Sequence, residues 1–168
     1  MNLQLEGQHI LITGGSKGIG LACARGFLDE GARVTLVSRD PAHLEAGVQA
    51  LRAGGPLDEA CLQVRTADLR DPAAALAALD SAEQDFGPVD VLVNSAGAAR
   101  RTPAAELTPQ AWHDAMQAKY FTYIHMMDPV VQRMGARGRG VIVNVIGSGG
   151  KVASPIHLPG GAANAALM

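Results

Sequence analysis

The stretch TGGSKGIG, residues 13–20, joins an apolar, strand-like run to a helical pattern. Where a strand enters a helix through glycines, backbone N–H groups and the positive helix end face outward together, and no Cβ keeps an anion away. The turn therefore predicts a site for the pyrophosphate of a dinucleotide. Its spacing, Gly14-x-x-x-Gly18-x-Gly20, matches neither G-x-G-x-x-G nor G-x-x-x-x-G-K-[ST]. Taken alone, the turn is equally compatible with a simple tight turn.

Five short apolar runs alternate with helical patterns along the chain. The runs are HILIT, RVTLV, ACLQV, VDVLV and GVIVNV, at residues 9–13, 33–37, 60–64, 89–93 and 140–145. Continuous runs of β-branched residues and leucine are typical of strands that are covered on both faces. Strict alternation of strand and helix predicts an α/β fold with a parallel sheet wound by right-handed crossovers, with residues 1–168 as a single domain.

Proline marks where several helices should begin. Asp40-Pro41, Asp71-Pro72 and Thr108-Pro109 each predict an N-cap followed by proline at the first helical position. Pro129 lies inside the pattern of the third of these helices and predicts a kink or an early end there. The closing stretch PGGAANAALM, residues 159–168, reads as the start of a fifth helix that no glycine, asparagine or basic turn closes.

Composition narrows the possible functions. The chain has 168 residues, 48% hydrophobic and 18% charged, with a formal net charge of −2, so no basic field is available for nucleic acid. Cys23 and Cys61 show no CxxC or Cys/His spacing, so we expect buried thiols in a reducing compartment and no metal site. No run of about 18 apolar residues occurs, and the N-terminus lacks a signal-peptide pattern. A cytoplasmic protein without a membrane partner is predicted.

The glycine turn resembles that of the short-chain dehydrogenase/reductase family, and further motifs follow in the family's order. Asp68 in ADLRD stands where the family places an acidic residue against adenine, and NSAG, residues 94–97, is similar to the family's N-N-A-G. Trp112 stands where the family's fourth helix opens, and GVIVNV is similar to its fifth strand. The resemblance implies a Rossmann-type doubly wound parallel sheet, with a cofactor across the carboxyl ends of the strands. It also implies two more strands, a further helix and a substrate lid. The fold is therefore expected to be truncated after the fifth strand and the start of the fifth helix.

The resemblance and the glycine turn together define a predicted cofactor-binding set. Its members are Gly14, Ser16, Lys17, Gly18, Ile19, Gly20, Ser38, Arg39, Asp68, Leu69, Asn94, Ala96 and Gly97.

The second strand is followed by residues that bear on the choice of cofactor. Ser38 stands where an Asp or Glu would hydrogen-bond the ribose of NAD, so a 2′-phosphate is not repelled. Arg39 can pair with that phosphate, and Lys17 adds a second positive charge. NADP(H) is therefore favoured over NAD(H). The competing interpretation makes Asp40 the ribose ligand, although its place before Pro41 is better explained by a helix cap.

The family's catalytic side chains are not found at their expected places. In the family, the tyrosine of Y-x-x-x-K exchanges a proton with the substrate oxygen, and the lysine lowers the pKa of that tyrosine. Alignment puts Gly160 at the tyrosine and Asn164 at the lysine, while the serine falls on Gly147 and the asparagine on Lys119. No tyrosine follows Tyr123, so realignment cannot recover it. All four positions are therefore predicted to be replaced.

Other groups can be considered as substitutes in the catalysis. Ser148 could take the serine role, His157 lies in the loop that should face the site, and Lys119 or Lys151 could place a positive charge near a developing alkoxide. Each also has a plainer interpretation as a loop or surface group.

Two functions remain open from the sequence. One is an NADP(H)-dependent oxidoreductase of a small carbonyl or alcohol with an atypical proton relay. The other is a catalytically inactive NADP(H)-binding protein that senses the cofactor or pairs with an active relative. In either case we expect a small-molecule ligand, and a homo-oligomer, dimer or tetramer, by analogy with the family.

Overall fold

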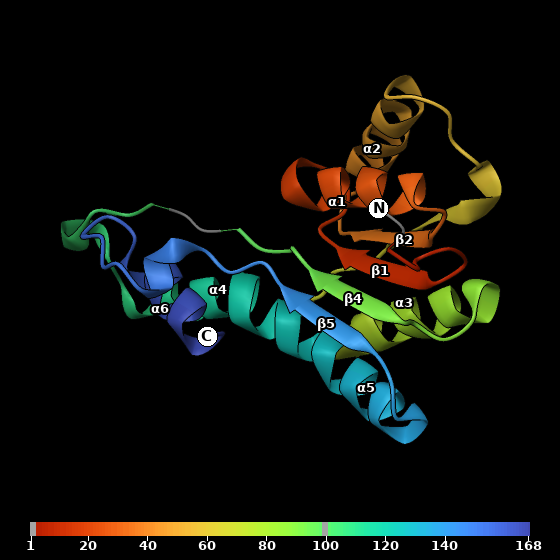
Figure 1. Cartoon of the computed structure of the whole chain (residues 1–168). Helices are drawn as coiled ribbons and strands as arrows, with labels where there is room; N and C mark the ends of the chain where they lie inside the picture. Colours follow the sequence, from red (N-terminus) through yellow and green to blue (C-terminus); the bar gives the residue numbers. More distant parts are fainter. Residues whose placement is uncertain (1–2, 99–100) are drawn as a thin grey trace.

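The computed structural model describes residues 3–98 and 101–168, and a sheet of five parallel strands lies at its centre (Figure 1). The strands are β1 (His9–Thr13), β2 (Arg33–Ser38), β3 (Leu62–Thr66), β4 (Val91–Asn94) and β5 (Val141–Asn144). Their order is β3-β2-β1-β4-β5, so the chain builds outward from β1 on one side and then on the other. The predicted doubly wound sheet is confirmed, and its switch point lies between β1 and β4.

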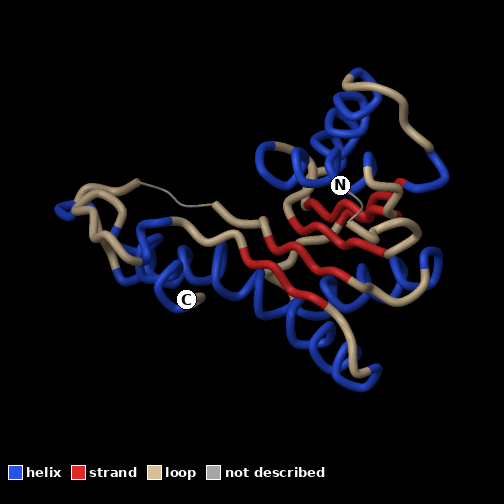
Figure 2. The backbone as a smooth tube through the Cα atoms, in the orientation of Figure 1, coloured by secondary structure: helices blue, strands red, loops and turns tan. Residues whose placement is uncertain are grey.

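Helices cover the two faces of this sheet. Helices α1 (Gly18–Asp29) and α2 (Pro41–Ala53) pack on one face, and α3 (Pro72–Phe86) and α5 (Thr122–Arg137) pack on the other (Figures 1 and 2). The remaining helices, α4 (Pro109–Ala115) and α6 (Leu158–Ala166), lie together beyond the carboxyl ends of β4 and β5.

Alternation along each central strand explains why the apolar runs are continuous. On β1, Ile10 and Ile12 join the core under α1 and α2, whereas Leu11 joins the core under α3 and α5. Because neighbouring residues of a strand point to opposite faces, a strand covered on both sides must be apolar throughout. The same division places Val93 in one core and Leu92 in the other.

The fifth strand lies at the edge of the sheet and is covered on one face only. Ile142 packs against the core on the α3 and α5 side, but Val141 and Val143 remain 54% and 45% exposed. The described residues therefore leave two apolar side chains of β5 exposed.

The third strand begins two residues later than the predicted range of 60–64. Asp58 accepts a hydrogen bond from the Ala60 N–H (3.0 Å) and caps a short 3₁₀ turn, Glu59–Cys61, which takes up the residues before the strand. Cys61 consequently lies in a turn rather than in a strand. Both Cys61 and Cys23 are free thiols, and they are half-buried rather than buried as expected.

The helical segment that follows Thr108 is longer than the proline at position 129 suggested. Thr108 caps α4 by accepting a hydrogen bond from the Ala111 N–H, as predicted. A π-helical turn, Met116–Phe121, joins α4 directly to α5, and α5 continues through Pro129 to Arg137. Of the two outcomes predicted at Pro129, a kink or an early end, the early end was wrong. Val130 and Met134, beyond the proline, are buried against the sheet and α3, and this burial offsets the missing N–H.

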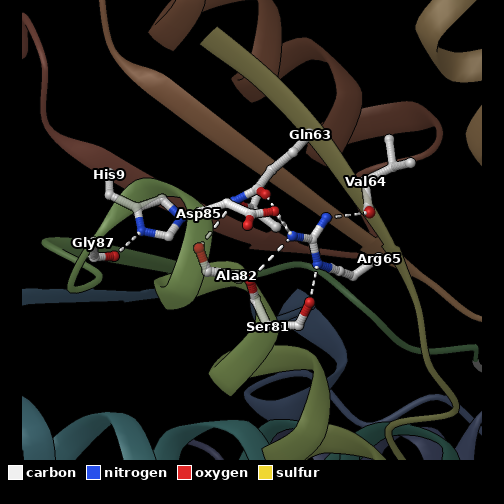
Figure 3. Close-up of polar contacts among 9 residues, drawn as sticks. His9, Gln63, Val64, Arg65, Ser81, Ala82, Asp85 and Gly87 are labelled. Carbon is white, nitrogen blue, oxygen red and sulfur yellow. Dashed lines mark hydrogen bonds and ion pairs between the residues drawn. The ribbon is translucent and has the colours of Figure 1, made fainter. Parts of the chain in front are cut away.

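A partly buried chain of hydrogen bonds ties together β1, β2 and β3 near their amino ends (Figure 3). The Gly87 carbonyl can only accept, so His9 Nδ1 carries the proton and donates to it over 2.7 Å. His9 Nε2 must then accept from Thr35 Oγ1 (2.7 Å), and Thr35 Oγ1 accepts in turn from Gln63 Nε2 (2.7 Å). Gln63 Nε2 also donates to the Ala82 carbonyl (3.1 Å). The direction of every donor in this chain is therefore fixed.

Protonation of His9 would break this chain. Burial lowers the pKa of His9 below its usual 6.5, and the positive charge of Arg33 lowers it further. The Gly87 carbonyl, Glu83 and Asp90 raise this pKa, but they do not outweigh the burial. The folded state therefore binds fewer protons than the unfolded state in the acid range. We expect the free energy of unfolding to fall as the pH drops below about 6.5, through the lower pKa of the folded state.

The substitution His9→Gln tests this expectation. It should cost about 1–3 kcal/mol at pH 8, through buried groups left unpaired, and it should flatten the pH dependence of unfolding between pH 7 and 5. Urea unfolding across that range gives both quantities. His113→Gln, at an exposed histidine on α4, is the matched control. Equal pH slopes in the wild-type protein and the His9→Gln variant would refute the assignment.

Candidate functional site

A cleft of about 670 Å³ runs along the carboxyl ends of the strands. Its size lies within the range of small-molecule sites. Its lining includes all but three of the thirteen predicted cofactor residues, the exceptions being Gly18, Gly20 and Asn94. The sequence therefore identified the position of the cleft, while the role of each residue in it stays a prediction.

Glycine is required where the turn at residues 13–20 approaches other backbone segments. A Cβ on Gly14 would lie 2.7 Å from the backbone N and Cα of Ala96, and a Cβ on Gly20 would lie 2.4 Å from the Gly14 carbonyl oxygen. Gly14 also has a φ of +65°, which favours glycine. These close approaches hold the start of α1 against the ends of β1 and β4.

The first turn of α1 is suited to binding an anion. Its leading N–H groups have no acceptors within the helix, Lys17 makes no capping hydrogen bond with its side chain, and the turn carries no acidic residue. A Cβ on Gly18 would meet nothing within 4 Å, so the backbone is open there. A pyrophosphate fits this arrangement of donors and positive helix end.

Asn94 lies behind the wall of the cleft rather than in it. Thr13 Oγ1 donates to Asn94 Oδ1 (3.1 Å) and accepts from the Ser95 N–H (3.2 Å). Asn94 Nδ2 donates in turn to Asn144 Oδ1 (3.1 Å). The fully buried Asn94 therefore joins the ends of β1, β4 and β5.

The end of β2 carries the residues that sequence reasoning linked to the ribose. Ser38 is half-buried and accepts a hydrogen bond from Ser16 Oγ (3.1 Å), and Arg39 is exposed on the cleft wall. Asp40 caps α2 by accepting from the Ala42 N–H (2.9 Å), which confirms its predicted role as a cap. His43, which sequence analysis did not single out, also lines the cleft.

Asp68 is engaged by a neighbour that the sequence did not single out. Arg70 donates from Nε to both carboxylate oxygens of Asp68 (3.0 and 3.1 Å) and from Nη2 to one of them (2.5 Å). This hydrogen bonding lowers the pKa of Asp68 to about 2, so the carboxylate is ionised at neutral pH. Arg70 lines the cleft beside Asp68.

The other end of the cleft contains two of the four predicted catalytic candidates. Lys119 and His157 line it, together with Asn164, whereas Ser148 is exposed in a 3₁₀ turn and is not part of the lining. His157 Nδ1 is buried and has no hydrogen-bond partner among the described residues. Asn164, 6% exposed, accepts a hydrogen bond from the Gly147 N–H (3.1 Å), which ties α6 to the chain after β5.

Lys119 is the most strongly perturbed cation in the cleft. Its Nζ lies 2.6 Å from Tyr123 Oη and 3.0 Å from the Val145 carbonyl oxygen, and burial lowers its pKa to about 8. The sequence analysis gave Tyr123 no role in the site. Its four-residue spacing from Lys119 was the available signal, but the contribution of Val145 requires the fold.

Comparison with known proteins gives the family. The model of the short chain dehydrogenase family matches residues 8–168. The chain belongs to the short-chain dehydrogenase family. It is 35% identical over 153 residues to gluconate 5-dehydrogenase of Gluconobacter oxydans, covering 90% of this chain and 57% of that protein. The chain therefore spans little more than half the length of that relative.

Two solved structures of similar proteins include NADPH. A variant of actinorhodin polyketide ketoreductase with NADPH has a TM-score of 0.88 and 31% identity, over 99% of this chain and 63% of that one. The second structure is an NADPH-bound short-chain oxidoreductase from Pseudomonas aeruginosa PAO1, described as containing an atypical catalytic center. It has a TM-score of 0.87 and 32% identity, over 95% of this chain and 62% of that one.

Two other kinds of site are not found in the described part of the chain. Residues 3–98 and 101–168 contain no group of three or more His, Cys, Asp or Glu side chains placed to hold a metal ion. None of the helices in these ranges has the length and apolar character needed to span a bilayer.

The close packing at Gly20 gives a direct test of the site's geometry. Gly20→Ala should lower the free energy of unfolding by about 1–3 kcal/mol, because the new Cβ meets the Gly14 carbonyl. Gly26→Ala, in the same helix, adds a Cβ that meets nothing and should raise it by up to about 1 kcal/mol. Denaturant unfolding measures both, and equal effects at the two positions would contradict the structure.

Proposed function

We propose that this protein is an NADP(H)-dependent oxidoreductase that acts on a small carbonyl or alcohol through an atypical proton relay. The observation that carries the proposal is the single cleft that runs from the glycine turn to Lys119. When bound, the nicotinamide would supply the hydride step, and the chain would bind it, orient it and handle the proton.

The cofactor would be held by groups spread along the strand ends. The open N–H groups at the start of α1 would bind the pyrophosphate, and Arg39 with Lys17 would bind the 2′-phosphate. Asp68 and Leu69 would lie near the adenine, where Arg70 competes for the carboxylate of Asp68. The two NADPH-bound structures of similar proteins support NADP(H) as the cofactor.

The proton relay is the least conventional part of the proposal. Lys119 and His157 are the candidate groups because both line the cleft, and Ser148 would need to move to reach it. The assignment of Gly160 and Asn164 to the family's tyrosine and lysine positions is part of this proposal. The similar oxidoreductase with an atypical catalytic center offers a precedent for such a site.

A second candidate function is a catalytically inactive NADP(H)-binding protein with a sensing or partner-subunit role. The specific observation in its favour is that no tyrosine follows Tyr123, so the family's proton donor has no counterpart in the closing stretch. Loss of a positioned general acid typically lowers the rate about 10²- to 10⁴-fold.

A cofactor titration and a substrate screen on the same sample separate these two functions. NADPH fluorescence measures binding, and its consumption measures turnover on a panel that includes 5-keto-gluconate, chosen from the activity of the Gluconobacter relative. Tight binding with turnover supports the oxidoreductase. Tight binding without turnover on any carbonyl supports the second function, and no binding refutes both.

A homo-oligomer, dimer or tetramer, in the cytoplasm is proposed as the working form. Val131 on α5 is 52% exposed and Trp112 on α4 is also exposed, and apolar side chains of this kind are common at subunit contacts. Light scattering at several concentrations tests the oligomeric state, and a monomer throughout would refute it.

The substitution Arg39→Ala tests the choice of cofactor. We expect the Kd for NADPH to rise roughly 10- to 100-fold, the loss of a charged hydrogen bond of about 1.5–3 kcal/mol, and the Kd for NADH to change little. Fluorescence titration with both cofactors measures this. Arg52→Ala, at an arginine of α2 that pairs with Glu59, is the matched control. Equal losses for both cofactors would contradict selection of the phosphate by Arg39.

A further inference from the structure

Lys119 and Tyr123 form a closed hydrogen-bonded triangle with the chain that leaves β5. Lys119 Nζ donates to Tyr123 Oη (2.6 Å) and to the Val145 carbonyl (3.0 Å), and Tyr123 Oη donates to the same carbonyl (2.8 Å). The carbonyl can only accept, so the tyrosine hydroxyl is a donor to it and an acceptor from the lysine. Each of the three groups therefore restrains the other two.

The lysine, rather than the tyrosine, reaches the cleft. Tyr123 is 0% exposed, whereas Lys119 lines the cleft. The stem of Lys119 crosses Gly97, where a Cβ would lie 2.7 Å from Lys119 Cδ. An ammonium has three N–H donors, and the described residues engage two of those of Lys119. The third is available to a group bound in the cleft.

Lys119 and Tyr123 stand in the reverse order of the family's Y-x-x-x-K motif, which was expected at α6. Residues 119–123 read K-x-x-x-Y, while the closing stretch has glycine and asparagine where Y-x-x-x-K was expected. We infer that Lys119 and Tyr123 are a relocated proton-transfer pair with exchanged roles: Lys119 gives the proton to the substrate oxygen, and Tyr123 is its positioning residue. This inference rests on the proposed function.

The ionisation of the pair agrees with these roles. Burial lowers the pKa of Lys119 to about 8, close to the pH at which a general acid works best, and burial raises the pKa of Tyr123, so its hydroxyl stays protonated. Other titratable groups lie on the elements around Lys119. They are Tyr120 in the same turn, His157, Asp68 and Arg70 on the cleft wall, His113 and Asp114 on the exposed side of α4, and His125, Asp128, Arg133 and Arg137 on α5, where His125 bonds the Leu69 carbonyl.

The proposed step balances as follows for reduction of a carbonyl. An Nζ–H bond of Lys119 breaks, an O–H bond forms on the substrate oxygen, and the electron pair of the broken bond stays on Nζ. The carbonyl carbon would receive its hydride from the reduced nicotinamide that the proposed function requires, and water would return the proton to the amine. In the direction of alcohol oxidation, the neutral amine accepts the hydroxyl proton.

Kinetics of three variants with NADPH and a carbonyl substrate test the inference. Lys119→Met should lower kcat about 10²- to 10⁴-fold and leave the Kd for NADPH nearly unchanged. Lys119→Arg should be similarly slow, because a guanidinium does not release a proton at this pH. For Tyr123→Phe, the loss of rate as pH rises through about 8 should move to lower pH, because the ammonium loses an acceptor.

Two controls separate these effects from a general disturbance of the helix. Gln117→Met changes an exposed residue of the same π-helical turn, and Tyr120→Phe removes a hydroxyl outside the cleft. Both should keep the wild-type rate and pH profile. Thermal unfolding of each variant shows whether it is folded.

A measurement without cofactor or substrate tests the pair directly. The chain has three lysines, Lys17, Lys119 and Lys151, so NMR of protein labelled with ¹³C and ¹⁵N in lysine resolves each titration through the Cε and Nζ shifts, with single Lys→Arg variants for assignment. One signal should titrate near pH 8, vanish in Lys119→Arg and move to lower pH in Tyr123→Phe. A Lys119 signal that titrates above pH 10 and ignores Tyr123→Phe would overturn the inference.

The failures of the two proposals can be told apart. Full turnover in Lys119→Met or Lys119→Arg would overturn proton donation by Lys119 and leave the proposed function standing. No turnover by the wild-type protein on any carbonyl would overturn the oxidoreductase function, and proton transfer by Lys119 with it.

Discussion

The absence of a Cβ at Gly14 and Gly20 is the constraint on which the site depends. It lets the backbone after β1 pass within contact distance of Ala96 and lets the first turn of α1 rest on the Gly14 carbonyl. With these approaches, the positive end of α1 points along the carboxyl edge of the sheet, where Thr13, Asn94 and Asn144 hold three strands together. Larger side chains at the two glycines would separate the turn from the strands, and the cleft would lose one wall.

Most of the fold could be predicted from the sequence because its signals are local. Continuous apolar runs predict the buried strands, and Asp-Pro pairs mark the starts of α2 and α3. The errors arose where tertiary contacts decide. Asp58 caps a turn that delays β3, and the burial of Val130 and Met134 carries α5 past Pro129. Neither effect can be recognised from one local pattern.

The candidate site was only partly predictable for a similar reason. The glycine turn is contiguous, so its place in the cleft follows from the sequence. The triangle of Lys119, Tyr123 and Val145 brings together two elements more than 20 residues apart, and the sequence does not show that they meet. Arg70 is only two residues from Asp68, but nothing in the sequence indicates that its side chain turns back onto that carboxylate.

The amino ends and the carboxyl ends of the strands carry different kinds of polar groups. At the amino ends, the chain from Gly87 through His9 and Thr35 to Gln63 is buried, and each of these bonds has a fixed direction. At the carboxyl ends, donors and charges are left open towards the cleft. The hydrogen bonds of fixed direction and the open groups of the cleft thus lie at opposite ends of the strands. Substitutions among the cleft residues can therefore change the shape and charge of the cleft without loosening the hydrogen bonds at the amino ends of the strands.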